Sequence, residues 1–404
     1  MRALVVERNA PRFAAAFVAG AVLGPARSVG PGPLRLSEID PPPLPGPDWR
    51  RVRPLLAGIC GSDLATLSGH SSRWFESMVS FPFVPGHEVV GELEENGGGR
   101  VVLQPVLGCA TRGVDPPCPA CAAGDVGRCE RVSFGHLSPG LQTGYCADTG
   151  GGWSASLVAH TSQLHPVPPQ LSDEEAVMVE PASCGVHAAL AARLPEGGLV
   201  VVLGAGTLGL CTVAALRRLA FPGTLLSVAK HREQASLARE LGADVVVDPD
   251  QLSRTVRRLT RSLATGGGSA RAQLSGGADA VIDCVGSADS LAEALAVVRP
   301  RGQVVLAGMP APVRVDLAPL WQREITLTGA YTYGREDRSE GATETFSLAF
   351  ELVASAGLGR LVSARYPLED YQAAIAHAAT AGRRGGVKVV FCPKERPRRP
   401  WRSS

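Results

Sequence analysis

A cysteine and a histidine, each beside glycine, are the first residues in this chain with evident chemistry. Cys60 lies in Gly58-Ile-Cys-Gly-Ser-Asp63, and His87 lies in Gly86-His-Glu88. Zinc accepts thiolate and imidazole ligands most readily, and neither segment closes a site alone. On a shared ion, Ser62 would lie within reach of a bound molecule and Asp63 could orient the histidine. The alternative is a small buried cysteine and an ordinary core histidine.

A third group with ligand chemistry follows a predicted helix at 173–179, which Ser172 and Glu175 cap as a capping box. The next segment is Glu-Pro-Ala-Ser-Cys-Gly-Val-His, residues 180–187. It offers a carboxylate, a thiol and an imidazole, and each is a candidate to complete the site of Cys60 and His87.

A loop dense in cysteine, proline and glycine carries a second candidate metal site. Cys118, Cys121 and Cys129 follow a C-x2-C-x7-C spacing, and Cys109 precedes them. Four thiolates on an irregular loop are what a closed structural zinc site needs, because metal ligation replaces the core that the loop cannot build. Asp115 competes with Cys109 as the fourth ligand, and scattered reduced cysteines are the alternative to a metal site.

A glycine-rich motif lies between a predicted strand at 199–203 and a predicted helix that ends at Leu219. The motif, Gly-Ala-Gly-Thr-Leu-Gly, has the G-x-G-x-x-G pattern in the context that dinucleotide binding requires. Its glycines allow close approach of a pyrophosphate to the helix N-terminus, whereas the alternative is only a tight turn. The residues expected to bind the cofactor here are Gly204, Gly206, Leu208 and Gly209.

The end of the next strand, predicted at 225–229, bears on the choice of cofactor. It is followed by Lys230, His231 and Arg232 instead of an acidic residue. A missing carboxylate removes repulsion of a ribose 2′-phosphate, and the cations can pair with that phosphate. The sequence therefore favours NADP(H) over NAD(H); the alternative is a solvated basic turn without a role in selectivity.

Length and composition indicate a globular protein with two domains. The chain has 404 residues, of which 45% are hydrophobic and 19% are charged. Lys plus Arg (40) nearly balances Asp plus Glu (38), so no overall field points to nucleic acid or membrane as a partner. The basic, proline-rich segment 394–404 is expected to be a disordered tail.

Ten cysteines, several at metal spacings, favour a reducing compartment, and we expect the cytoplasm. The apolar run 13–25 imitates a signal peptide, but cleavage there would remove a predicted strand at 2–7 and expose the thiolates to oxidation. The run is also too short to span a bilayer.

The pattern of apolar residues predicts a β-rich first region and an α/β second region. The strands expected in the first region lie at 2–7, 34–39, 52–58, 84–93, 100–105, 155–158 and 164–167. Those expected afterwards lie at 199–203, 225–229, 243–247, 280–283, 303–307, 324–329 and 387–391, with helices at 345–356 and 367–379.

Taken together, these motifs resemble the zinc-containing medium-chain dehydrogenase/reductase superfamily, the alcohol and polyol dehydrogenases. The resemblance also includes Ala-Val-Ile-Asp-Cys-Val-Gly at 280–286. It implies a GroES-like β-rich catalytic domain, 1–183 with 332–404, and a doubly wound Rossmann coenzyme domain, 184–331. It further implies two zinc ions per chain, a nicotinamide cofactor, an alcohol or carbonyl substrate, and a homodimer or homotetramer.

The resemblance also assigns roles to residues of the catalytic site. Cys60 and His87 would bind the catalytic zinc, Glu88 would be an occasional ligand, and Glu180 would be the third protein ligand, as in the polyol branch. Cys184 is the rival for that position. Ser62 matches the hydroxyl that takes the alcohol proton, and Lys388 matches a basic residue that contacts the pyrophosphate.

Three departures from the family pattern stand out. Ala65 replaces a histidine that ends the proton relay in many classical members, so protons must leave by another route. The first structural cysteine is displaced to Cys109, and residues 13–30 form an unusual insertion. The implied activity is hydride transfer between an alcohol or polyol and NADP(H). The alternatives are a zinc-free quinone or enoyl reductase, which would lack the cysteines, and a silent nucleotide-binding protein.

Overall fold

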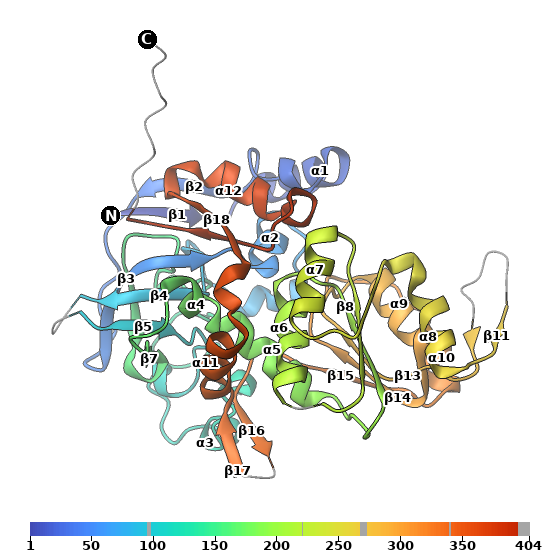
Figure 1. The fold of residues 1–404 in the computed structure, drawn as a ribbon. Helices are drawn as coiled ribbons and strands as arrows, with labels where there is room; N and C mark the ends of the chain where they lie inside the picture. Colours follow the sequence, from blue (N-terminus) through green and yellow to red (C-terminus); the bar gives the residue numbers. More distant parts are fainter. Residues whose placement is uncertain (95–97, 220, 267–272, 339–340, 395–404) are drawn as a thin grey trace. The chain divides into compact units, whose positions relative to one another are not determined.

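The computed structural model describes residues 1–94, 98–219, 221–266, 273–338 and 341–394. The chain forms two compact units (Figure 1). The first consists of Met1–Glu180, Gly359–Arg384 and Lys388–Ser404, and the second of Pro181–Leu358 and Gly385–Val387. The first unit is therefore assembled from both ends of the sequence.

A seven-stranded sheet organises the first unit. Its strands run in the order β18-β19-β3-β4-β5-β7, and β6 pairs with β3. Only β18 and β19 are parallel to each other; the other pairs are antiparallel. This is the β-rich, GroES-like fold that the sequence predicts. The bounds are β3 Trp49–Gly58, β4 Val89–Leu93, β5 Arg100–Leu103, β6 Leu157–His160, β7 Leu164–Pro166, β18 Val362–Tyr366 and β19 Lys388–Phe391.

A separate hairpin and a helix begin the chain. Strands β1 (Arg2–Val6) and β2 (Leu34–Glu38) pair antiparallel, as their sequences predict. The insertion between them forms helix α1 (Ala10–Leu23), whose N-cap Asn9 accepts a hydrogen bond from the amide of Arg12. Phe13 of this helix packs edge-on against Phe81, so the helix is anchored to the first unit.

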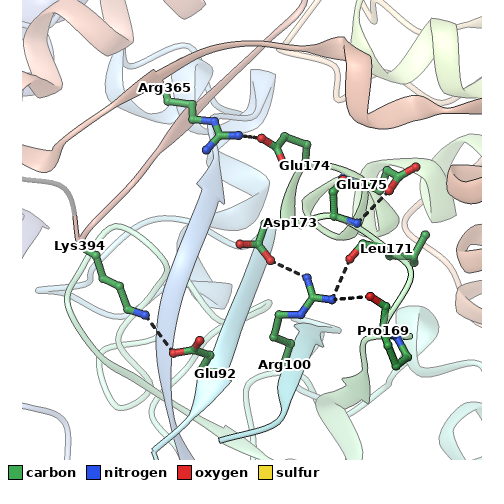
Figure 2. A network of polar contacts seen from close by, with 10 residues as sticks. Glu92, Arg100, Pro169, Leu171, Asp173, Glu174, Glu175, Arg365 and Lys394 are labelled. Atoms are coloured by element: carbon green, nitrogen blue, oxygen red, sulfur yellow. Dashed lines mark hydrogen bonds and ion pairs between the residues drawn. The ribbon is translucent and has the colours of Figure 1, made fainter.

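Short helices connect the strands of the first unit. Helix α4 (Asp173–Val177) has the predicted capping box of Ser172 and Glu175. Arg365 of β18 forms an ion pair with Glu174 of α4, and Arg100 pairs with Asp173 (Figure 2). The first pair joins the C-terminal segment of this unit to the N-terminal one. The other helices are α2 Gly61–Leu67, α3 Pro119–Ala122 and α12 Tyr371–Ala378.

The second unit contains a six-stranded sheet in which every neighbouring pair is parallel. Its order is β10-β9-β8-β13-β14-β15, which is the doubly wound arrangement with the first strand at the centre. The predicted Rossmann fold is confirmed. The bounds are β8 Leu199–Leu203, β9 Thr224–Val228, β10 Val245–Val247, β13 Ala278–Asp283, β14 Val298–Leu306 and β15 Thr326–Gly329.

Helices flank this sheet in two groups (Figure 1). Helix α6 contacts α7 and α11, whereas α9 contacts α8 and α10. The central strands are buried on both sides, since every residue of β8 is buried. The helices are α5 Val179–Ala191, α6 Thr207–Arg218, α7 Arg232–Glu240, α8 Leu252–Thr260, α9 Ala288–Val297, α10 Ala318–Gln322 and α11 Thr345–Ala356.

The units differ from the predicted domain boundaries over residues 332–358, which belong to the second unit. This segment contains the hairpin of β16 (Arg335–Arg338) and β17 (Gly341–Glu344), followed by α11. Helix α11 joins the second unit because its buried side chains pack toward α6. The second unit also contains a short antiparallel pair of β11 (Ala264–Thr265) and β12 (Gln273–Leu274).

The predicted disordered tail lies outside the described residues from 395 onward. Among the helices that the structure describes, none combines the length and the apolar character needed to cross a bilayer.

Candidate active site

Three predicted site residues meet in the first unit. Cys60 is the N-cap of α2 at the end of β3, and His87 and Glu88 directly precede β4. Because β3 and β4 are paired neighbours, the two segments are brought together. The sulfur, one imidazole nitrogen and one carboxylate oxygen lie within 4.8 Å of one another. They form one compact set of metal-binding donors.

Asp63 contacts two members of this set. Its Oδ2 accepts a hydrogen bond from the Cys60 amide at 2.9 Å, and its Oδ1 lies 3.5 Å from Nδ1 of His87. Burial by itself would lower the pKa of His87, but the negative charges of Asp63 and Cys60 raise it well above its ordinary value. The donors therefore favour a positive charge at this point, which a divalent cation would supply.

Glu88 has a buried cationic partner that the motifs do not indicate. Nζ of Lys388 forms an ion pair with Oε2 of Glu88 and donates a hydrogen bond to the Ile59 carbonyl at 3.3 Å. Burial would lower the pKa of Lys388, but Glu88 and Cys60 raise it above its ordinary value. A Cβ at position 58 would lie 1.8 Å from the Glu88 carboxylate, so a side chain there would displace Glu88 from its present position.

The predicted pyrophosphate contact of Lys388 remains a prediction; in the structure its side chain is almost completely buried and pairs with Glu88. Glu180 is also buried, and its charge acts on Lys388. Within the described residues, the donor group contains neither Glu180 nor Cys184. His187, in the second unit, instead has its Nδ1 2.7 Å from Oε1 of Glu336.

The four cysteines of the predicted structural site converge. Sulfurs of Cys109, Cys118, Cys121 and Cys129 lie within 4.8 Å of one another. The sulfurs of Cys109 and Cys129 are 3.8 Å apart, which equals the edge of a tetrahedron with Zn–S bonds of about 2.3 Å. Cys109, and not Asp115, completes this set, so the alternative fourth ligand is wrong.

Backbone amides point at all four sulfurs. The amide donors belong to Cys118, Cys109, Cys121 and Arg131, at 3.3–3.5 Å from their acceptors. Although burial raises the pKa of Cys118, hydrogen bonds from the amides of Cys121 and Glu130 lower it to about 7. The amides therefore favour the thiolate of Cys118, the form that binds zinc, whereas burial raises the pKa of Cys121 and Cys129 in the absence of an ion.

A fully buried arginine holds the cysteine loop together. Arg112 donates hydrogen bonds to five backbone carbonyls at 2.6–3.3 Å. The sequence gives no sign of this role, because a single arginine in a loop has no periodic pattern or spacing that would mark it. The acceptors belong to Leu107, Phe134, Leu137, Ser138 and Gly140.

The glycine-rich motif of the second unit has the form of a dinucleotide-binding turn. Gly204 has a φ of +91°, and a Cβ at Gly209 would lie 1.8 Å from the Gly204 carbonyl oxygen. Gly206 is the N-cap of α6, and a Cβ there would meet no atom within 4 Å. Gly204 and Gly209 are therefore needed for the backbone shape of the turn, whereas Gly206 leaves open space at the N-terminus of α6.

Two features flank this turn. Asp283 ends β13, and its buried carboxylate accepts hydrogen bonds from the amides of Val285 and Gly286 and from the Ser290 hydroxyl. Beyond β9 the chain continues to the exposed side chains of Lys230 and Arg232, while His231 is the N-cap of α7. The basic residues noted in the sequence thus directly follow β9.

Comparison with known proteins decides the family. Residues 46–169 match the alcohol dehydrogenase GroES-like domain, and residues 207–355 match the zinc-binding dehydrogenase domain. A Mycobacterium tuberculosis protein, named as a probable zinc-binding alcohol dehydrogenase, is 31% identical over 314 residues, covering 74% of this chain and 72% of the relative. The chain belongs to the zinc-binding alcohol dehydrogenase family.

Other relatives of this zinc-binding dehydrogenase agree. The sorbitol dehydrogenase of Arabidopsis thaliana is 29% identical over 365 residues, covering 86% of this chain and 90% of the relative. A solved zinc-binding dehydrogenase of Sinorhizobium meliloti, bound to NADP, is 27% identical with a TM-score of 0.65, covering 89% of this chain and 95% of that one. The predicted resemblance is confirmed.

The residues of this dehydrogenase fit the groups that its family implies. The four sulfurs suit a structural zinc ion, and the thiolate, imidazole and carboxylate of the first unit suit a second. The open space at Gly206 suits a pyrophosphate. Arg112 is the main addition to the predicted site residues, and Lys388, predicted to contact the pyrophosphate, has a buried partner in Glu88 that had no local signal.

Proposed function

We propose that this chain is a zinc-dependent dehydrogenase that transfers a hydride between an alcohol or polyol and NADP(H). One observation carries the proposal: donors of Cys60, His87 and Glu88 lie within 4.8 Å of one another in a chain that also has a dinucleotide-binding turn. Such a set would hold a cation able to polarise a substrate oxygen, and the turn would hold the hydride carrier.

The catalytic ion is held in this proposal by Cys60, His87 and Glu180, with Glu88 as an exchanging ligand. Glu180 is 96% buried and acts electrostatically on Lys388, which itself pairs with Glu88. A cation held by Cys60 and His87 would also attract this buried carboxylate. The four-cysteine set holds the second, structural ion.

When bound, zinc lowers the pKa of an alcohol hydroxyl and nicotinamide accepts the hydride. The chain's own residues supply position and proton transfer. Ser62, two residues after Cys60 on the first turn of α2, takes the alcohol proton. Lys388 neutralises Glu88 and so limits the negative charge beside the site.

The preference for NADP(H) is supported by the residues after β9. Lys230 and Arg232 are exposed and can pair with a 2′-phosphate, and the first acidic residue of the segment, Glu233, comes only after them. Relatives named for sorbitol and L-idonate point to a small polyol as substrate. We further propose a cytoplasmic homo-oligomer, a dimer or a tetramer.

The decisive experiment is an activity panel of secondary alcohols, polyols and aldehydes with each nicotinamide cofactor, together with metal analysis. We expect two zinc ions per chain and reduction of NADP⁺ by at least one alcohol. One zinc ion without turnover would favour a silent nucleotide-binding protein, and reduction of quinones or enones without zinc would favour the zinc-free branch. Stronger turnover with NAD⁺ would overturn the cofactor preference alone.

A further inference from the structure

Helix α1, the insertion at the edge of the first unit, packs on the protein by one face only (Figure 1). Ala16 is fully buried, and a Cβ at Gly20 would lie 3.6 Å from the side chain of Ser28. The ring of Phe13 lies 6.4 Å from that of Phe81, measured between centroids. Positions 13, 16 and 20 fall on one side of an α-helix, so this side is the one that holds α1 in place.

The opposite face of α1 is apolar and exposed. Its residues Ala14, Val18, Ala21 and Val22 follow the spacing i, i+4, i+7 and i+8, which places them together. Val18 is 58% exposed, Val22 is 74% exposed, and Leu23 at the end of the helix is 68% exposed. From residue 13 to residue 26 the sequence has no charged or polar side chain. A surface helix ordinarily carries such side chains on its outer face, so this face is suited to an apolar environment.

The charges that flank α1 are all positive. From Arg8 to Ser37 the sequence contains four arginines and no acidic residue. Arg8 and Arg27, which lie before and after the helix, are exposed, and Arg12 is partly exposed. Within the described residues, none of these three guanidinium groups pairs with a carboxylate. The first turn of α1 also has no acidic residue, so the positive end of the helix dipole adds to these charges.

An anionic lipid surface matches both properties of this segment. Apolar side chains of the outer face can enter the boundary between headgroups and acyl chains, and the flanking arginines can bind lipid phosphates. A second copy of this chain fits less well, because a two-fold contact through α1 brings identical positive segments together. The chain's own segment 396–402 also has the wrong charge, since it contains four arginines and no acidic residue.

We propose that helix α1 docks this enzyme on the surface of an anionic lipid bilayer. The helix lies parallel to the surface, with Val18 and Val22 inserted among the headgroups. Arg8, Arg12 and Arg27 bind lipid phosphates at its two ends. The attachment is reversible, because the helix enters the interface without crossing the bilayer. Docking does not depend on the substrate, so its failure would leave the proposed function untouched.

Sedimentation of the full-length protein with lipid vesicles tests the proposal. One set of vesicles is pure phosphatidylcholine, and in the other about one third of the lipid is phosphatidylglycerol. We expect binding to the anionic vesicles to be at least about tenfold tighter than to the neutral ones. Added salt should release the protein, because it screens the attraction between the arginines and the lipid phosphates.

Two double variants separate the apolar contribution from the charged one. Val18→Gln with Val22→Gln should weaken binding to the anionic vesicles at least about tenfold, because two inserted side chains become polar. Glutamine is a good helix former, so these exposed positions should stay helical. Arg8→Gln with Arg12→Gln should also weaken binding about tenfold or more and should reduce its dependence on salt.

Leu259→Gln with Leu263→Gln is the matched control. It removes two exposed apolar side chains from the second unit, and it should bind the anionic vesicles as tightly as the wild type. Thermal unfolding shows whether each variant is folded. If the valine variant is not, the arginine variant and the salt dependence of the wild type still decide, since both leave the apolar face unchanged.

Three results would overturn the proposal. The first is equal binding of the wild type to neutral and anionic vesicles, and the second is full binding by the folded valine variant. The third is a wild type that ignores vesicles but forms oligomers that the valine variant loses in sedimentation velocity. That result would assign the apolar face of α1 to a second copy of the chain.

Discussion

Oδ1 of Asp63 lies 3.5 Å from Nδ1 of His87, and both side chains are almost completely buried. The same carboxylate accepts a hydrogen bond from the Cys60 amide, so Asp63 orients two neighbouring candidate metal ligands. Orientation of this kind strengthens metal binding, because a ligand already held in place loses less freedom when the ion arrives.

Asp63→Asn should therefore weaken the catalytic zinc site. The amide can still contact Cys60 but no longer offers a negative charge to His87. We expect the affinity for that ion to fall about 10-fold to 100-fold, as measured by competition with a chelator. The four-cysteine site is the internal control, and unchanged release of both ions would contradict the prediction.

Arg112→Met should destabilise the cysteine loop. The substitution leaves five backbone carbonyls without their shared donor, at a cost of about 3–5 kcal/mol. Thermal unfolding and retention of the structural zinc ion measure the effect. Arg128→Met is the matched control in the same loop, because Arg128 is exposed and pairs only with Asp125 among its described partners. Its cost should stay below about 1 kcal/mol.

Two glycine substitutions separate folding from cofactor binding. Gly209→Ala places a Cβ 1.8 Å from the Gly204 carbonyl, so it should lower the melting temperature. Gly206→Ala meets no protein atom within 4 Å and has a φ of −77°, so it should leave the melting temperature of the cofactor-free protein unchanged.

We nevertheless expect Gly206→Ala to weaken cofactor binding at least about tenfold, because the methyl group occupies space that the pyrophosphate needs. Cofactor fluorescence titration measures this change. Wild-type affinity in Gly206→Ala would show that the pyrophosphate does not bind at this turn.

The double variant Lys230→Ala, Arg232→Ala tests cofactor choice. Loss of two cations beside a 2′-phosphate should raise the Kd for NADP⁺ about 10-fold to 100-fold. The Kd for NAD⁺ should change less than about threefold, since NAD⁺ has no phosphate there. Parallel loss of both affinities would point to a general electrostatic or structural effect instead.

Glu92 gives a pH-dependent contribution to stability. Hydrogen bonds from Arg53 and Lys394 lower its pKa (Figure 2 shows the Lys394 contact). Because the folded-state pKa is depressed, the stabilisation is present above the unfolded value, 4.5, and is lost as pH falls through the lower folded value. Glu92→Gln should lower the free energy of unfolding at pH 7 by less than about 1 kcal/mol, which would appear as a slightly lower melting temperature. Near pH 2 it should have no effect. A difference that persists at pH 2 would contradict this origin.

The parts of the site that sequence could predict are those whose residues share a short motif. The cysteines of the loop lie close together in the sequence, and so do the glycines of the turn. Their spacing alone was therefore enough to indicate both sites. The choice of Cys109 over Asp115 needed the structure, because both lie before Cys118 at distances that a loop can span.

Contacts between distant segments had no sequence signal. Lys388 reaches Glu88 only because β19 pairs with β3, and Tyr145 reaches Asp63 from a loop without periodicity. The predicted strand 84–93 is also shorter than expected: β4 begins at Val89, because His87 and Glu88 are turned toward the site. Helix α1 does have a signal, an Asn9 cap with proline in the first turn, which the apolar run obscured.

Strand β19 has a consequence for synthesis. It bonds to β3 at Ala57 and Gly58 and brings Lys388 to Glu88, yet it comes from the last segment of the chain. While the ribosome is still translating, the edge of β3 is unpaired and the Glu88 carboxylate has no ammonium partner. The nascent protein can complete most of its Rossmann unit early, but the surroundings of Glu88 are complete only after β19 has left the ribosome.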